Sequence, residues 1–576
     1  MRQRFLINSA AVALFALAVL TVPAARALAD GGPIMPLSEV KAGMDCTGET
    51  VVQGTTISSF NVHVIDVVRA ANQGPRILVS VSGPAVDQTG VAAGMSGSPV
   101  YCLDASGTLR NAGAISQGIG QYGNNVALVT PIEQMLGEPV KPPSSAPRLT
   151  AKARSLLGPF TVGGLSPSLL GVLQQAGRDA GRSVIAAPPS LGVADFPVQD
   201  LVPGASVGAA YSTGTIASGA VGTVTYRDGS TVYAFGHELD GAGRRSLLLE
   251  DAYVYYVVSN PDPSASYKLA FPGHPLGTLT SDTQAAVIGE LGALPSLIPV
   301  QVTAHDLDTG RVISEQTQVA DETAVGLPLG SSLLDTIAPL AVGQAAIDIY
   351  NGPPASESGR MCLRVLIRES SQPLGFCNRY VGTGAPGDAG LSPPVVSAGA
   401  ATDVGTAFGV LDQVRFAALH VTKVQATIEA QRGLAEASIA GAQARSLVKA
   451  GGTVPVQLRV RVFRGGARTV SFRLRIPRSA RGPLLVTIHG PAFSPSSSGF
   501  GGGAGGLASL LGSGLGGGAP PGSPPPSIAV VRKAIQAIGH YDGLSASFDG
   551  GKPAHAYSDP GLLISGRATL SFMARR

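Results

Sequence analysis

One short segment of this 576-residue chain has the residue types that acyl-transfer chemistry requires. Residues 94–99 read Gly-Met-Ser-Gly-Ser-Pro, so Ser96 stands between two glycines. Glycine accepts a positive φ and allows close backbone approach, so the amides of Gly94 and Ser96 could point at one spot and hold an oxyanion. Ser96 is then a candidate nucleophile. A small-residue turn between two strands is the alternative, because Gly, Ser and Pro are common in turns and the chain has 76 glycines.

A serine nucleophile needs a nearby base, which is usually a histidine. Among eight histidines, His237 differs from the others because it follows a strand-like segment and a glycine in Tyr-Ala-Phe-Gly-His-Glu-Leu, residues 233–239. His237 is therefore the candidate general base. The other seven stand in ordinary strand, turn or loop contexts: His63, His274, His305, His420, His489, His540 and His555.

Taken together, the two motifs resemble the SpoIVB family of serine peptidases, the S55 peptidases. In that family a G-T-x-T-[FY] strand, here residues 222–226, leads into a glycine-histidine pair, and the serine lies in G-M-S-G-S-P. The similarity covers roughly residues 33–345. It includes the segments GVAAGMSGSPVY, ISQGIGQYG, VTPIEQML and KLAFPGHPLGTLTSD.

The resemblance implies a mostly β fold, with a chymotrypsin-like pair of β-barrels and an active site between them. Ser96 would be the nucleophile, His237 the base, and the Gly94 and Ser96 amides the oxyanion hole. We expect Ser96 Oγ about 2.6 to 3.2 Å from an imidazole nitrogen, or somewhat farther without substrate. The activity implied is that of a serine-type endopeptidase on a protein or peptide substrate, with self-processing left open.

The chain departs from the family's pattern in two respects. Ser96 precedes His237 by 141 residues, so the two barrel halves stand in permuted order. The family's aspartate belongs shortly before the serine, where this chain has Gly83-Pro84, and Asp87 is the nearest carboxylate. An acid from Asp87, Asp240 or elsewhere should reach the second ring nitrogen if a triad is present.

Two non-enzymatic interpretations stay open: an envelope-associated scaffold that keeps the barrels for binding, and a surface protein that assembles through its glycine-rich insertion.

No phosphate loop, metal cluster or cofactor fingerprint is found, so no cofactor or metal is expected. Charged residues make up only 14% of the chain and the net charge is +4. No nucleic-acid partner is therefore expected. The sequence does not indicate the oligomeric state.

The N-terminus predicts export to the cell envelope, the periplasm or the medium. Residues 1–29 have two early arginines, an apolar run and a final Ala-Leu-Ala, which is typical of a signal peptide cleaved after Ala29. An uncleaved membrane anchor is the alternative. Export makes structural disulfides plausible, and proximity in sequence favours the pairs Cys46–Cys102 and Cys362–Cys377 among three possible pairings.

Composition shifts divide the chain into three folded parts. A Pro- and Ser-rich stretch at residues 141–147 separates a serine-bearing barrel half at 33–140 from a histidine-bearing half at 150–345. Strict alternation of apolar residues with arginine or other polar residues from Val454 to Ile476 predicts a hairpin in a β-sandwich-like domain at 400–576. Residues 493–527 are rich in Gly, Ser and Pro and predict a flexible insertion.

Overall fold

The computed structural model describes residues 32–70, 73–119, 124–179, 181–187, 196–260, 265–322, 332–384, 392–491, 525–538, 543–559 and 561–575. The expected signal peptide and most of the expected insertion at 493–527 lie outside these residues. None of the helices in the described ranges combines the length and the apolar character that a membrane span requires. The fold is mostly β, as the sequence predicts.

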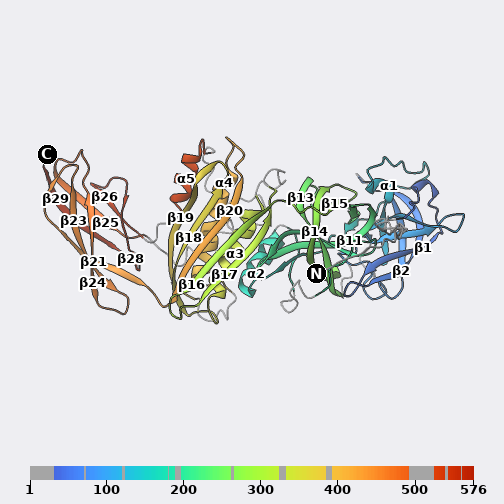
Figure 1. Cartoon of the computed structure of the whole chain (residues 1–576), viewed down its shortest axis with the longest axis horizontal. Helices are drawn as coiled ribbons and strands as arrows, with labels where there is room; N and C mark the ends of the chain where they lie inside the picture. Colours follow the sequence, from blue (N-terminus) through green and yellow to red (C-terminus); the bar gives the residue numbers. More distant parts are fainter. Residues whose placement is uncertain are drawn as a thin grey trace, which may run out of the picture.

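The first unit is a closed antiparallel β-barrel, at the blue end of Figure 1. Six strands pair in the order β1-β2-β3-β6-β5-β4, and β4 returns to β1. Alternation places one face of each strand in the core, as where Val62 and Val64 are buried and His63 between them is exposed. The strands are β1 (Asp45–Val51), β2 (Ile57–Ala70), β3 (Gly74–Ser82), β4 (Pro99–Leu103), β5 (Leu109–Ile119) and β6 (Val126–Pro131).

Three short elements complete this unit. The 3-10 helix η1 (Leu37–Glu39) precedes the barrel, and α1 (Ile132–Met135) follows β6. The strand β7 (Ala153–Ser155) pairs with the end of β5, beyond the residues that β4 covers. β7 therefore extends the sheet beside the serine loop.

Six further strands also pair in a ring, in the order β10-β13-β14-β15-β12-β11 and back to β10. They are β10 (Ser206–Gly214), β11 (Ala217–Asp228), β12 (Thr231–Ala234), β13 (Gly243–Val258), β14 (Tyr267–Asp282) and β15 (Val287–Leu291). Before them come β8 (Phe160–Gly163), α2 (Pro167–Asp179) and β9 (Val184–Ala186), of which β8 pairs with β11 and β9 with β8. This second ring carries the histidine motif.

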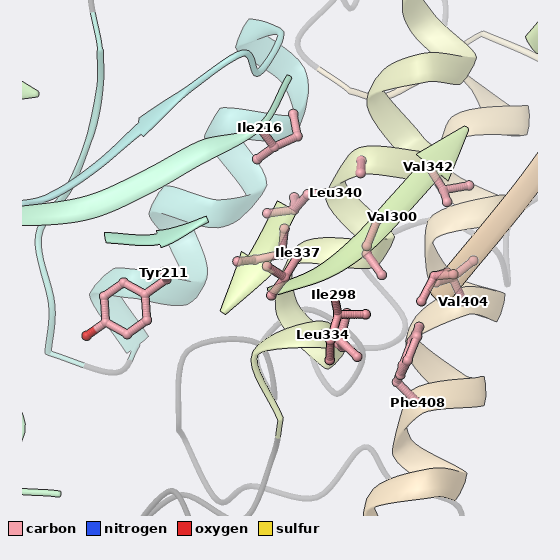
Figure 2. Packing of buried hydrophobic residues seen from close by; sticks show 14 of the residues in the cluster. Tyr211, Ile216, Ile298, Val300, Leu334, Ile337, Leu340, Val342, Val404 and Phe408 are labelled. Carbon is pink, nitrogen blue, oxygen red and sulfur yellow. The ribbon is translucent and has the colours of Figure 1, made fainter. Parts of the chain in front are cut away.

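The sheet then continues into a layer covered by helices. β17 joins it to β10, and its strands are β16 (Leu297–Asp306), β17 (Val312–Ala320), β18 (Ser356–Ile367), β19 (Ser370–Thr383) and β20 (Val421–Arg432). The helices are α3 (Leu333–Asp348), α4 (Val395–Asp412) and α5 (Ile528–Gln536). Figure 2 shows Ile298 and Val300 of β16 packed among residues of α3 and α4, so the helices bury one face of this layer.

The last unit is a β-sandwich with its own apolar core, at the C-terminal end of Figure 1. One sheet has the order β24-β23-β21-β28 and the other β22-β29-β25-β26-β27. The predicted hairpin is present as β23 and β24, with alternate residues buried. The strands are β21 (Glu436–Ala444), β22 (Leu447–Lys449), β23 (Thr453–Val462), β24 (Ala467–Arg475), β25 (Gly482–His489), β26 (Gly543–Phe548), β27 (Ala554–Ser558), β28 (Leu563–Ser565) and β29 (Arg567–Arg575).

The sandwich begins at Glu436, later than the boundary at residue 400 that the sequence suggested. The reason is that β20 hydrogen-bonds to β16 and β18 and therefore belongs to the preceding sheet. α4 packs against that sheet as well. Residues 400–432 are part of the helix-covered layer.

Both predicted disulfides are present. Cys46 of β1 is bonded to Cys102 of β4, with the Cα atoms 4.4 Å apart. Cys362 of β18 is bonded to Cys377 of β19, at a Cα distance of 4.0 Å. The first of these bonds ties the strand that follows Ser96 to its neighbour in the barrel.

Candidate active site

Ser96 lies in a tight loop that ends at β4. The flanking glycines, Gly94 and Gly97, have φ of 91° and 94°, a conformation that other residues rarely adopt. The Ser98 N–H and hydroxyl both donate to the Met95 carbonyl, the hydroxyl at 2.6 Å. The loop is therefore closed by its own hydrogen bonds and anchored behind by the Cys46–Cys102 disulfide.

The serine loop is docked against strand β11 of the second ring. Thr223 N–H donates to the Ser96 carbonyl at 2.8 Å, and Thr225 Oγ1 donates to the Gly97 carbonyl at 2.7 Å. A Cβ on Gly97 would stand 1.9 Å from the Thr223 oxygen, so only glycine fits there. The segment Gly-Thr-Val-Thr-Tyr, residues 222–226, thus contacts the serine motif directly.

His237 follows β12 after two residues in the left-handed region. Phe235 has φ 66° and Gly236 has φ 69°, which is unusual for a bulky aromatic residue and marks a specifically held backbone. The Gly236 carbonyl accepts a 2.7 Å bond from Thr130 Oγ1 of the first barrel. This turn therefore carries His237 toward the first barrel.

Both motifs meet at one carbonyl group of β5. Gly97 N–H donates to the Ile115 oxygen at 2.8 Å, and a Cβ on Gly236 would stand 3.4 Å from the same oxygen. The residues next to Ser96 and His237 are thus brought together from the two rings. The expected hydrogen bond between Ser96 Oγ and the imidazole is not formed: Ser96 Oγ and His237 Nε2 are both buried, and neither has a partner among the described residues.

The hydrogen bonding of His237 defines its protonation state. Nδ1 lies 2.6 Å from the backbone oxygen of Glu238. A carbonyl oxygen can only accept, so Nδ1 carries the proton and Nε2 keeps its lone pair. Burial lowers the pKa of His237 below its usual value of 6.5, against a smaller raising effect of the Glu238 carbonyl. The imidazole is thus a neutral potential base.

A buried charge cluster holds the loop that follows His237. The Asp282 carboxylate at the end of β14 accepts the N–H groups of Leu239, Asp240 and Gly241 at 2.7, 3.0 and 2.8 Å. Arg245 pairs with Asp240, and its Nε and Nη2 each lie 2.9 Å from a Glu322 oxygen. The cluster fixes the path of the chain immediately beyond the histidine.

Neither acid suggested by the sequence reaches His237. Asp87 is exposed and accepts the N–H of Gly83 at 2.7 Å within its own turn, and Asp240 is paired with Arg245. No carboxylate of the described residues bonds to either nitrogen of His237. A histidine–carboxylate pair does occur elsewhere, where His274 Nδ1 lies 2.9 Å from Asp251 of the second ring.

The two amides expected to form an oxyanion hole differ in their partners. Gly94 N–H is not free, because it donates to the Leu156 carbonyl at 2.8 Å. From Ala93 to Ser98, every amide except that of Ser96 has an acceptor among the described residues. The Ser96 amide is therefore the donor still available to a developing negative charge.

Lys268 is a buried residue of the site that the sequence reasoning did not single out. Its Nζ donates to Thr50 Oγ1 at 2.9 Å and to Thr223 Oγ1 at 3.2 Å, and its side chain packs against Gly94. Burial lowers the pKa of Lys268 to about 7. The signal in the sequence that could have found it is a lysine directly before the apolar run Leu-Ala-Phe, residues 269–271. Lys268 thus contacts the serine loop at Gly94 and is linked to it through Thr223, whose Oγ1 donates to the Gly94 carbonyl at 3.3 Å.

The described residues contain no group of three or more His, Cys, Asp or Glu placed to hold a metal ion. The groups that the described residues bring to the site are an alcohol, a neutral imidazole and the Ser96 amide. A scan against protein-family models gave no match for this chain. A search of curated proteins gave no match either.

Proposed function

We propose that this chain is an exported serine endopeptidase of the SpoIVB type, with Ser96 as nucleophile and His237 as general base. The observation that carries the proposal is that the serine loop is docked onto strand β11 of the second ring, while the glycine-histidine turn of that ring is bonded to Thr130 of the first barrel. At this junction Ser96 Oγ and His237 Nε2 are buried without partners. Buried polar atoms without partners are costly and often indicate a functional site.

The residues suggest the following division of labour. His237 Nε2 takes the proton of the Ser96 hydroxyl as Oγ adds to a peptide carbonyl, and returns it to the leaving amine. The Ser96 amide donates to the oxyanion. The Glu238 carbonyl holds Nδ1–H in the required tautomer, which is the orienting part of a triad aspartate's role. It supplies no full negative charge to the imidazolium, so we expect a slow enzyme.

Export is supported by two observations. Residues 1–29 have the pattern of a signal peptide. The two disulfides suit an oxidising compartment, because disulfides rarely persist in a reducing cytosol. A secreted, periplasmic or envelope-associated location is therefore part of the proposal.

A non-catalytic envelope scaffold that retains the barrels is the second candidate. It is favoured by two observations: no carboxylate in the described ranges bonds to His237, and Ser96 is 0% exposed. In this case the junction would serve only to join the two rings. The two candidates differ in whether Ser96 can react.

Reaction with a fluorophosphonate probe tests the proposal, because the probe modifies an activated serine. The full-length mature protein should be labelled at Ser96, as located by peptide mass spectrometry. Ser96→Ala and His237→Ala should lose the label, whereas Ser106→Ala, in an exposed turn of the same barrel, should keep it. Labelling that persists in Ser96→Ala, or none in any folded form, would favour the scaffold.

A further inference from the structure

Residues 153–158, Ala-Arg-Ser-Leu-Leu-Gly, lie across the serine loop as an added strand. β7 pairs antiparallel with β5, with Arg154 opposite Gly118. Leu156 continues this pairing, since its N–H donates to the Ser116 oxygen at 3.1 Å. Addition of an extended segment to a sheet edge is a common way for proteins to bind a peptide. The chain therefore holds one of its own segments as it would hold a peptide ligand.

The carbonyl group of Leu156 is the part of this segment that concerns acyl transfer. Its oxygen accepts the 2.8 Å hydrogen bond from the Gly94 amide, two residues before Ser96. A peptide carbonyl bound by a backbone amide of the nucleophile's loop has the polarisation that attack by serine requires. The neighbouring Ser96 amide has no acceptor in the described part of the chain and could join as negative charge develops.

The side chain of Leu156 is the anchor of the segment. It is 3% exposed and belongs to the core cluster of the first barrel, together with Val86, Val91 and Met95, whereas Arg154 and Ser155 are exposed. Leu157 instead packs against the cluster of the second ring. The peptide bond between Leu156 and Leu157 thus joins a residue packed in the first barrel to a residue packed against the second ring, at the candidate site.

We propose that residues 153–156 occupy the acyl side of the substrate site and that the Leu156–Leu157 bond is the first substrate, cut in cis. This inference rests on the proposed peptidase function. Ser96 Oγ adds to the Leu156 carbonyl carbon while His237 Nε2 takes the hydroxyl proton. The C–N bond breaks, the Leu157 nitrogen takes that proton, and the Leu156 ester on Ser96 is hydrolysed by water to a carboxylate.

The same geometry predicts which other peptides the site could cut after this first cleavage. The Leu156 carbonyl occupies the Gly94 amide, so the carbonyl of another peptide can take that place only after residues 153–156 leave. Their departure would expose the apolar core surface that Leu156 packs against and the edge of β5 that pairs with residues 153–155. The substrate class in trans is therefore an extended peptide with leucine, or a side chain of similar size, before the cut bond.

Intact-mass measurement and N-terminal sequencing of the mature protein test this inference. The wild type should yield a fragment that begins at Leu157, and Ser96→Ala should stay whole. Leu156→Asp should slow the cut by at least about tenfold, because a carboxylate does not suit an apolar surface. Leu149→Asp, in the same linker but outside the site, should be cut like the wild type.

Fluorophosphonate labelling of the same samples separates two kinds of failure. If Ser96 is labelled in the wild type or in Leu156→Asp while the wild type stays whole on long incubation, the self-cleavage inference is wrong and the peptidase proposal stands. If neither protein is labelled or cut, the peptidase proposal itself fails. A cut at the same bond in Ser96→Ala would assign it to another protease and overturn the inference.

Discussion

His237 owes its state to its immediate backbone and its burial. The Glu238 carbonyl fixes the proton on Nδ1, and removal from water disfavours the imidazolium. The Glu238 carboxylate raises the pKa of His237 and the buried Arg76 guanidinium lowers it, each by less than burial does. A histidine held in this way is neutral at neutral pH although no carboxylate of the described residues is hydrogen-bonded to it.

The pH dependence of the reaction should reflect this state. Since the pKa of His237 in the folded protein lies below 6.5, the base form persists as the pH falls through 6.5. The rate of fluorophosphonate labelling should therefore be flat from neutral pH down past 6.5, with its acid limb at lower pH. Labelling rates measured from pH 4 to 8 check this, and an acid midpoint above 6.5 would contradict the assigned environment.

Gly97 should tolerate no side chain. In Gly97→Ala the new Cβ would meet the Thr223 oxygen at 1.9 Å, at a φ of 94° that alanine disfavours. We expect a loss of more than about 3 kcal/mol in the free energy of unfolding, together with the loss of Ser96 labelling. Gly107→Ala is the matched control, because Gly107 has a φ of 79° and open space around its Cα. The control should lose only about 1 kcal/mol, as measured by urea unfolding.

At the scale of single elements, strand β14 carries Lys268 next to the serine loop. Its burial lowers the free energy of unfolding by an amount that depends on pH. The pKa of Lys268 falls from 10.5 to about 7 on folding, so the unfolded chain binds more protons between these pH values. Stability should therefore rise with pH in this window, by up to about 1.4 kcal/mol per unit. Lys268→Met should remove that slope in urea unfolding at pH 7, 8 and 9. Lys41→Met, at an exposed site, should keep it.

The loop after His237 depends on the buried Arg245. Arg245→Met would leave Asp240 and Glu322 without their cation, which should cost about 3 to 5 kcal/mol in unfolding free energy. Ser96 labelling should fall as well, because the loop positions His237. Arg244→Met is the neighbouring exposed control and should behave like the wild type in both assays.

Helices and strands could be predicted where neighbouring residues in the sequence show the period of that element. The hairpin from Val454 follows from strict alternation of apolar and polar residues. α4 was not predicted, because its Gly, Ala and Val residues are buried on most sides and give no amphipathic period. The roles of Lys268 and Leu156 depend on contacts across the rings, which no local pattern records.

Across the whole molecule, the two disulfides should contribute unequally. Cys46 and Cys102 are 56 residues apart, and Cys362 and Cys377 only 15. Replacing the first pair by serine should cost about 4 kcal/mol and the second about 3 kcal/mol, because a longer loop loses more entropy on closure. Urea unfolding of the two double variants without reductant checks the order. A larger loss from the second pair would show that strain or residual structure outweighs loop length.

The assembly of the rings was predictable in part. The serine and histidine motifs pointed to two barrels, and the structure brings both motifs to the Ile115 carbonyl. The parallel pairing of β16 with β20, which sets Val300 opposite Val424, was not predicted, because it joins strands far apart in the chain. The same holds for the sandwich boundary at Glu436 and for the Leu156 carbonyl on the Gly94 amide.

The order of the motifs along the chain has a consequence for biosynthesis. Ser96 belongs to the half that leaves the ribosome first, and His237 follows 141 residues later. The six strands of the first barrel pair with one another and are all made before the residues that dock against the serine loop. A nascent chain therefore carries the alcohol without its base. Under the proposed function, hydrolysis of neighbouring chains by this pair must wait until β11 and the turn at Gly236 have been made and folded against the first barrel.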